Sequence, residues 1–183
     1  YFNSLKVREE IGDKYGVANS LSNISGVYGD EGDYDEALKF SYKSLKIRKE
    51  IGDKRGIATS LNNMGVTYEK LGDSDKALSI YHEALKLSKE VGFKTGISTS
   101  LNNIGDTEYD RENYKEAKNY ASLSLEVARE NGNPEEIRAA ASLLSKVYEK
   151  EGNGKMALEM FKLFIQMNDS ANNEAAQKAA AKQ

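Results

Sequence analysis

The stretch Gly56-Ile57-Ala58-Thr59-Ser60-Leu61-Asn62-Asn63-Met64 decides the fold, because it recurs along the chain. Near-identical copies begin 40 residues earlier and later, at Gly16 and Gly96, and a more divergent copy begins at Glu136. A second set of markers keeps the same period, at Ala37, Ala77, Ala117 and Ala157. Self-similarity at a fixed period of this length is the signature of a repeat architecture. The sequence therefore predicts a chain of repeated structural units.

Each unit has the pattern of two helices joined by a turn. Leu61, Met64 and Tyr68 are spaced i, i+3 and i+7, which places their side chains on one face of a helix. Gly72 is suited to a left-handed turn, and Asp73 can cap the helix that follows. We expect Ala37, Ala77, Ala117 and Ala157 to let the two helices of each unit cross closely, because their side chains are small.

The starts of the second helices carry an expected capping pattern. Asp33 and Asn113 are each followed three residues later by a glutamate, Glu36 and Glu116. This is the spacing of a capping box, in which the cap side chain and the glutamate bond each other's backbone N–H groups. We therefore expect a capping box at both positions.

The string Leu61-x2-Met64-Gly65-x2-Tyr68, followed by Ala77, Tyr81 and Ala84, resembles the tetratricopeptide repeat motif. The 40-residue length and the Gly-Asp-Lys turn are similar to the long repeats of kinesin light chains and of mitotic-spindle and G-protein regulators. The resemblance covers residues 1 to about 168. It implies an all-α fold, a right-handed superhelical solenoid of antiparallel helix pairs with about 3.5–4 repeats plus a C-terminal helix. Departures from the motif include serine in place of the helix-packing glycine at Ser25 and Ser145.

The repeat register predicts the organisation of the chain. The chain begins inside a repeat, and we therefore expect it to be a piece of a longer protein. The expected boundaries are 1–12 for the second helix of a repeat that lacks its first helix, 13–52, 53–92 and 93–132 for three repeats, 133–168 for a divergent fourth repeat, and 169–183 for a capping or linker helix.

Composition argues against several classes of function. The chain has a net charge of −3 and lacks the clustered lysine and arginine residues that nucleic-acid binding needs. No apolar run in the sequence is long enough to span a membrane. The single histidine, His82, and the absence of cysteine leave no set of metal ligands. No serine or threonine has a base partner in the context that activates a nucleophile. We expect no catalysis, no cofactor, no metal, no nucleic acid, and no direct membrane contact within this piece.

Repeated polar residues on the first helices are the candidate binding site. A solenoid of this kind exposes a concave face lined by first helices, and asparagine in mid-helix has mediocre helix propensity. A side-chain amide both donates and accepts hydrogen bonds, which suits the main chain of an extended peptide. The candidate site residues are Asn19, Asn23, Thr59, Asn62, Asn63, Thr99, Asn102 and Asn103. The family resemblance implies that Asn23, Asn63 and Asn103 face the groove and hold peptide main chain. The alternative is that these amides form ladders between repeats, or recur only because repeats were duplicated.

These observations predict a module that binds a protein or peptide partner within a larger bacterial signalling protein. The run from Gly56 to Gly65 resembles the repeat arrays of Bacteroidetes-type sensor histidine kinases or nucleotide cyclases. That resemblance implies a periplasmic location if the array belongs to a membrane sensor, and a cytoplasmic one otherwise. The alternative function is a structural or self-associating scaffold without a peptide ligand, in which exposed terminal helices form a homodimer.

Overall fold

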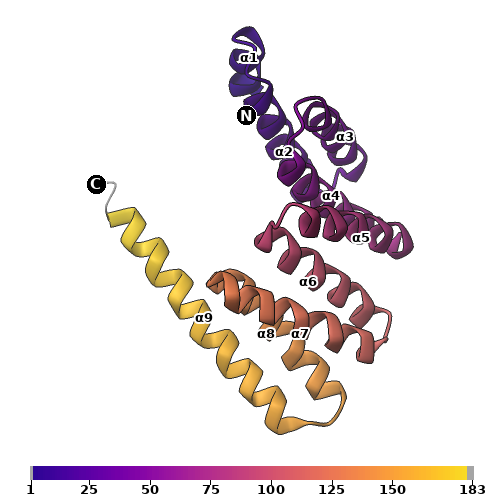
Figure 1. Ribbon diagram of the computed structural model, residues 1–183, viewed down its shortest axis with the longest axis vertical. Coiled ribbons are helices and arrows are strands. Elements are labelled where there is room, and N and C mark those ends of the chain that lie inside the picture. Colours follow the sequence, from indigo (N-terminus) through magenta and orange to yellow (C-terminus); the bar gives the residue numbers. More distant parts are fainter. Residues whose placement is uncertain (1, 181–183) are drawn as a thin grey trace. The chain divides into compact units, whose positions relative to one another are not determined.

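The computed structural model describes the backbone of residues 2–180 and the side chains of residues 2–169, and within that range the secondary structure is helical, without strands. Within each compact unit of the chain, successive helices run antiparallel and are joined by short turns (Figure 1). The all-α fold expected from the repeat is confirmed. In chain order the helices are α1 (Phe2–Glu10), α2 (Lys14–Glu31), α3 (Tyr34–Glu50), α4 (Lys54–Lys70), α5 (Ser74–Glu90), α6 (Lys94–Asp110), α7 (Tyr114–Asn131), α8 (Pro134–Lys150) and α9 (Gly154–Ala180).

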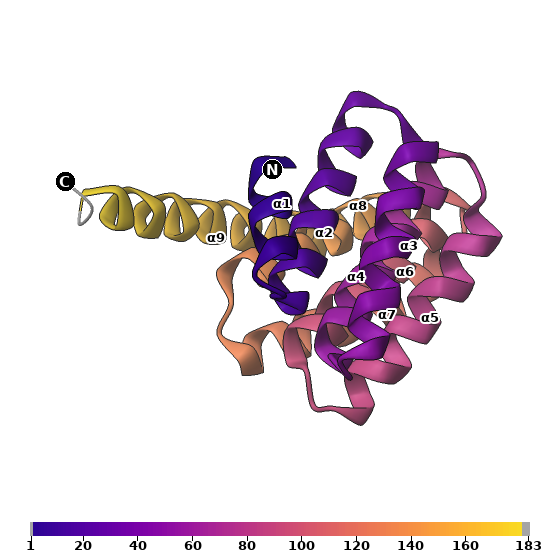
Figure 2. The ribbon, with the colours of Figure 1, turned by 90° about the horizontal axis from the view of Figure 1, so that it is seen from above.

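The chain divides into two compact units, Tyr1–Gly96 and Ile97–Gln183. In the first unit α2 pairs with α3 and α4 pairs with α5, while α3 also packs against α4 (Figures 1 and 2). Helix α1 packs against α2, and α2 touches α4, so the first helices of two successive hairpins are neighbours. In the second unit α8 packs against both α7 and α9.

Glycine in the left-handed region ends the helices, as the sequence predicts. Gly72 has φ +81°, and the carboxylate of Asp73 then accepts a 3.0 Å hydrogen bond from the backbone N–H of Lys76 at the start of α5. Glu112 occupies the corresponding turn before α7 with φ +64°, a conformation that residues with a Cβ rarely adopt. The turns therefore share one geometry even where glycine is replaced.

The expected capping boxes are not formed. Asp33 accepts a hydrogen bond from the N–H of Glu36 at 3.3 Å, but the Glu36 carboxylate bonds Lys39 instead of returning to Asp33. The prediction at Asn113 is wrong, because its side chain makes no cap bond and its amide donates to Glu108 at 2.6 Å. An amide can donate as well as accept, and here the carboxylate outside the helix is the stronger partner.

The crossing within each hairpin depends on small residues. Gly65 of α4 lies directly under the buried ring of Tyr81 of α5, so a side chain at residue 65 would collide with that ring. In the preceding hairpin Ser25 and Ser41 stand at these two positions and bond each other at 2.7 Å. The Ser25 hydroxyl also bonds the carbonyl of Ala37. Glycine is therefore required at residue 65 because the partner helix carries a large ring there.

Each unit has its own apolar core, built from the stripes that the repeat predicts. Tyr28, Tyr68 and Tyr148 are half-buried and pack against these cores. The buried residues of the first unit include Val17, Leu21, Ile24, Phe40, Leu45, Leu61, Met64, Ile80 and Ala84. Those of the second unit include Ala117, Ala121, Leu125, Ala140, Leu143, Leu144, Val147 and Met160.

Helix α9 is continuous from Gly154 to Ala180 and has no end near residue 168. The expected division at 168/169 therefore does not coincide with a helix boundary, and the repeat boundaries remain predictions. The residues from 170 onward carry no described side chains, so the packing of the expected capping or linker helix lies outside the described residues. Among the described residues, no helix has both the length and the apolar character needed to cross a membrane.

Candidate functional site

The structure separates the predicted site residues into two groups. Asn23 of α2 and Asn63 of α4 are exposed, and Asn103 of α6 is half-buried. Within the described part of the chain, the side-chain amides of these three residues make no hydrogen bond. They stand at the same position of successive first helices. Their amides are therefore available to an incoming partner.

The remaining predicted residues are engaged inside the protein or buried. Asn19 accepts a 2.6 Å hydrogen bond from Arg48, and Asn62 is only 4% exposed. The amide of Asn102 donates to Asp106 at 2.8 Å. The hydroxyl of Thr59 bonds the carbonyl of Arg55 in its own helix. Thr99 is half-buried.

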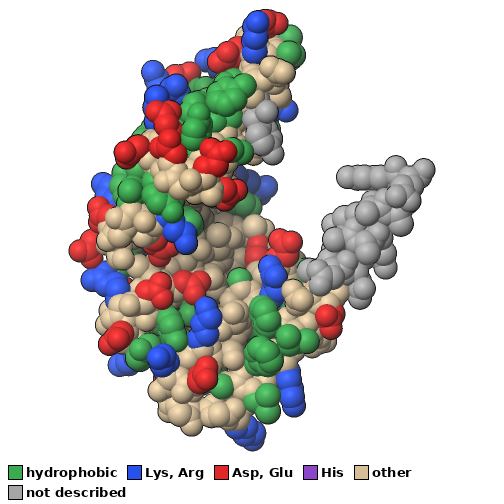
Figure 3. Space-filling model, turned by 180° about the vertical axis from the view of Figure 1, so that it is seen from behind, with side chains coloured by type: hydrophobic (Ala, Val, Ile, Leu, Met, Phe, Trp, Pro, Cys, Tyr) green, Lys and Arg blue, Asp and Glu red, His purple; other side chains and the backbone are tan. Residues whose placement is uncertain are grey.

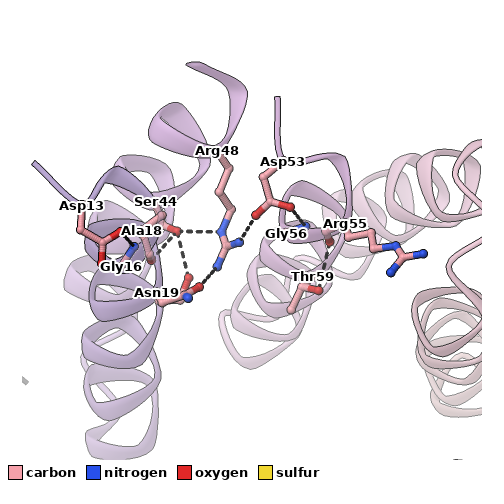
Figure 4. Close-up of polar contacts among 11 residues, drawn as sticks. Asp13, Gly16, Ala18, Asn19, Ser44, Arg48, Asp53, Arg55, Gly56 and Thr59 are labelled. Atoms are coloured by element: carbon pink, nitrogen blue, oxygen red, sulfur yellow. Dashed lines mark hydrogen bonds and ion pairs between the residues drawn. The ribbon is translucent and has the colours of Figure 1, made fainter. Parts of the chain in front are cut away.

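Arg48 of α3 connects three helices of the first unit (Figure 4). Its guanidinium is almost fully buried and donates to Asn19 of α2, to Ser44 of α3 and to the Asp53 carboxylate at 2.5 Å. Asp53 in turn caps α4 by accepting from the N–H of Gly56 at 2.9 Å. This network fixes the first helices of two successive hairpins relative to each other, and Asn19 belongs to it.

A pocket of about 290 Å³ opens between α2 and α4, and Asn63 is the predicted site residue that lines it. The other lining residues are Ser25, Gly26, Gly29 and Asp30 of α2, Tyr34 of α3, and Val66, Thr67 and Lys70 of α4. Sequence reasoning missed this pocket. The available signal was the pair Gly26 and Gly29, which stand within the C-terminal half of α2 where the next repeat has Val66 and Glu69.

Two opposite charges lie at this pocket. Asp30 and Lys70 are both exposed, and neither forms an ion pair with the described residues. On the face that Figure 3 shows, acidic and basic side chains are interspersed without a large field of one sign. The pocket therefore offers one charge of each sign to an occupant.

A tyrosine pair joins α3 to α4. The hydroxyls of Tyr42 and Tyr68 are 2.9 Å apart and share a hydrogen bond. This bond, with a smaller contribution from burial, raises the pKa of Tyr68 to about 12. The pair is a direct contact between successive hairpins, and either hydroxyl can be its donor.

No group of three or more acidic or histidine side chains that could bind a metal ion occurs in the region with described side chains. His82 is exposed on α5. The polar features of the chain are thus hydrogen-bonding and packing features of a helical scaffold.

The geometry defines a scaffold of repeated helical hairpins, and comparison with known proteins gives its family. Two tetratricopeptide repeat models match the chain, over residues 4–90 and 97–131. The chain belongs to the tetratricopeptide repeat family. A comparison with curated protein sequences finds no match.

Several solved structures share the fold. BtubC from P. vanneervenii superposes with a TM-score of 0.72 at 21% identity, over 87% of this chain and 66% of that one. Aspartyl phosphate phosphatase F from Bacillus subtilis gives a TM-score of 0.78 at 17% identity, over 85% of this chain and 41% of that one. A signal transduction ATPase with numerous domains from Pyrococcus horikoshii, which has a tetratricopeptide repeat sensor, gives 0.73 at 26% identity, over 86% of this chain and 25% of that one. This chain thus spans less than two thirds of each of these proteins.

Family and fold together define a coarse function. Repeats of this family form protein–protein interaction modules, and the fold is typically a non-catalytic scaffold. The chain is accordingly a module that binds protein partners.

Proposed function

We propose that the chain binds extended partner segments through side-chain amides at one repeated position, Asn23 and Asn63 in the first unit and Asn103 in the second. The observation that carries the proposal is the contrast between these three residues and the other predicted asparagines. Asn19 and Asn102 make hydrogen bonds within the protein, whereas the three amides at the repeated position make none among the described residues. An amide presents a donor and an acceptor at once, which matches the N–H and C=O of a peptide backbone.

We further propose that this binding serves a larger signalling protein. Support comes from the 26% identity to the P. horikoshii protein, in which the tetratricopeptide repeats are described as a sensor. The resemblance of the Gly56–Gly65 run to the arrays of bacterial sensor kinases and cyclases points the same way. In such a protein the module would receive the partner and the rest of the chain would produce the output.

The binding proposal is tested with peptides selected from a random library for affinity to the wild-type chain. Asn63→Ala should weaken binding of a selected peptide about three- to tenfold, since the loss of one hydrogen bond is worth about 0.5–1.5 kcal/mol. Its melting temperature should stay near that of the wild type, because the exposed amide makes no internal bond. Calorimetric titration and thermal unfolding measure the two effects.

Asn19→Ala is the matched control, because it removes an asparagine whose amide bonds Arg48. This variant should lower the melting temperature and leave peptide affinity unchanged. Unchanged affinity in Asn63→Ala, or a loss of stability in that variant as large as in Asn19→Ala, would contradict the groove and support the ladder interpretation.

A second candidate function is a self-associating scaffold, and exposed apolar side chains favour it. In the first unit Val7, Ile11 and Tyr15 are each more than half exposed. In the second unit Leu158, Phe161 and Ile165 lie at i, i+3 and i+7 on α9 with exposed fractions of 54%, 50% and 43%. Exposed apolar stripes of this kind mark interaction surfaces.

A further inference from the structure

Gly26 and Gly29 of α2 are not accounted for by the fold. Both lie inside a helix with ordinary right-handed backbone angles, so neither is required for a positive φ. A Cβ built on either residue would meet nothing within 4 Å, whereas one on Gly65 would collide with the Tyr81 ring. Glycine inside a helix is destabilising relative to alanine. The helix therefore carries two unfavourable residues without a packing reason.

The two glycines form part of the wall of a pocket. Both line the pocket between α2 and α4, where a side chain on either would project into open space. They are one helical turn apart, so together they expose a flat stretch of helix backbone along one side of the pocket. Val66 lies at the repeat-equivalent position to Gly26 and is 41% exposed, so α4 supplies an apolar wall.

The remaining lining residues define the chemistry of an occupant. The ring of Tyr34 is a further apolar wall, and Asp30 and Lys70 lie at the pocket with charges of opposite sign. A charged side chain would meet one like charge. An uncharged aromatic ring can instead receive the Lys70 ammonium on its face and donate a hydrogen bond from its edge to Asp30.

The pocket is large enough for a single side chain. Its volume of about 290 Å³ lies just below the range for small-molecule sites, about 300–1,000 Å³. Asn63 lines the same pocket, and in the proposed function its amide holds peptide main chain. A side chain that leaves the main chain next to Asn63 would therefore have the pocket within reach.

We propose that this pocket is a subsite for an aromatic side chain with a hydrogen-bond donor on its edge, tryptophan or tyrosine, within the extended partner segment. The subsite rests on the proposed function, because the segment that carries the ring is the one bound by Asn63. The two glycines make room for the ring at the expense of helix stability.

Blocked amino acids test the pocket separately from the whole groove. N-acetyl-tryptophanamide, N-acetyl-tyrosinamide, N-acetyl-phenylalaninamide and N-acetyl-leucinamide are titrated into the full chain while the backbone amide signals of residues 26 and 29 are followed by NMR. The tryptophan and tyrosine amides should shift both signals in a saturable manner. Phenylalaninamide should bind about threefold more weakly because it cannot donate to Asp30, and leucinamide about tenfold more weakly because it also lacks a ring face for Lys70.

Variants identify the contacts. The double variant Gly26→Ala/Gly29→Ala should melt at a higher temperature than the wild type and lose binding of the tryptophan amide at least tenfold. Gain of stability together with loss of binding is a combination that a purely structural role for the glycines does not produce. Asp30→Asn should weaken the tryptophan amide about threefold and leave the phenylalanine amide unchanged.

The outcomes separate the subsite from the groove. Equal affinity for leucinamide and tryptophanamide, or full binding by the double glycine variant, would overturn the subsite. Peptides that bind without an aromatic residue and are lost in Asn63→Ala would also overturn the subsite but keep the groove. In the third outcome the aromatic amides shift the signals of residues 26 and 29, but Asn63→Ala does not change the affinity for the selected peptides. The pocket would then stand as an aromatic site, and the proposal that Asn63 holds the segment carrying the ring would be overturned.

Discussion

Arg48 connects the helices of the first unit, because its buried guanidinium bonds groups on α2, α3 and the cap of α4. Arg48→Met removes those bonds and leaves the Asp53 carboxylate, whose side chain is 18% exposed, without its cation. Removing one partner of a largely buried ion pair is strongly destabilising. We expect Arg48→Met to lower the free energy of unfolding by about 2–4 kcal/mol.

Urea denaturation measures this effect, and Lys46→Met on the same helix is the control. Lys46 is exposed, so its replacement should change the free energy of unfolding by less than about 0.5 kcal/mol. A small effect of Arg48→Met would show that the network is not a determinant of stability.

The hydrogen bond between Tyr42 and Tyr68 makes stability depend on pH in the alkaline range. In the folded state the pKa of Tyr68 is raised to about 12, and in the unfolded chain it returns to about 10. Between these values the folded state holds the proton more tightly, so stability is fully present below pH 10 and declines as the pH rises toward 12. Tyr68→Phe should remove this part of the decline.

Denaturant unfolding of the wild type and of Tyr68→Phe at a series of pH values between 8 and 12 measures the difference. The difference in free energy of unfolding between the wild type and Tyr68→Phe should be largest below pH 10 and should become smaller above it. A gap that stays constant with pH would mean that the hydroxyl pair does not perturb the titration of Tyr68.

At the scale of helices, glycines at different positions have opposite effects. Gly65→Ala places a methyl group against the buried Tyr81 ring and should destabilise the chain by about 1–3 kcal/mol despite the better helix propensity of alanine. Gly26→Ala meets open space and should stabilise it by about 0.5–1 kcal/mol.

Thermal unfolding of the two single variants provides the comparison. Both changes replace a mid-helix glycine with alanine, so helix propensity is matched and only the surroundings differ. Similar shifts in melting temperature would contradict a close crossing of α4 and α5 over Gly65.

The helices and their turns could be predicted from the sequence, whereas much of the candidate site could not. Leu61, Met64 and Tyr68 gave the apolar face of α4, and glycines such as Gly72 gave the turns, because periodicity and positive φ are local properties. The roles of Asn19 and Asn63 depend on what other helices bring near them. Asn19 stands at the repeat position of Thr59, and its bond to Arg48 depends on what α3 brings near it, which its own stretch of sequence does not indicate. The pocket likewise needs α2 and α4 side by side.

At the scale of the whole molecule, the family and the all-α architecture could be predicted because a repeat multiplies a weak local signal. Nearly the same string begins at Gly16, Gly56 and Gly96. A departure from the pattern in one repeat is therefore outweighed by the other repeats when the fold is predicted. The course of α9 could not be predicted in this way. Its stretch beyond residue 168 has no counterpart in the other copies, and the helix continues there without a break.

The scaffold alternative makes a prediction for the whole molecule. Association through the apolar stripes of the terminal helices requires the chain to sediment as a dimer in a concentration-dependent manner. Ile11→Lys or Phe161→Lys, each at a residue that is at least half exposed, should then return it to a monomer without lowering its melting temperature. Lys6→Ala on the exposed surface of α1 is the control. A wild-type chain that stays monomeric at all concentrations would contradict this alternative.

The Arg48 network has a consequence for the order in which the hairpins can be arranged. Arg8 stands 40 residues before Arg48 and likewise reaches across to the next hairpin, through the carbonyl of Gly16 and the hydroxyl of Ser20. At the following two positions of this series stand Ser88 and Ala128, which carry no charge. A hairpin that begins with Asp53 therefore matches a preceding hairpin that supplies an arginine, and would leave its carboxylate uncompensated behind one that supplies alanine. The repeats look alike but are not interchangeable, because the residue that meets the start of the next hairpin differs from one repeat to another.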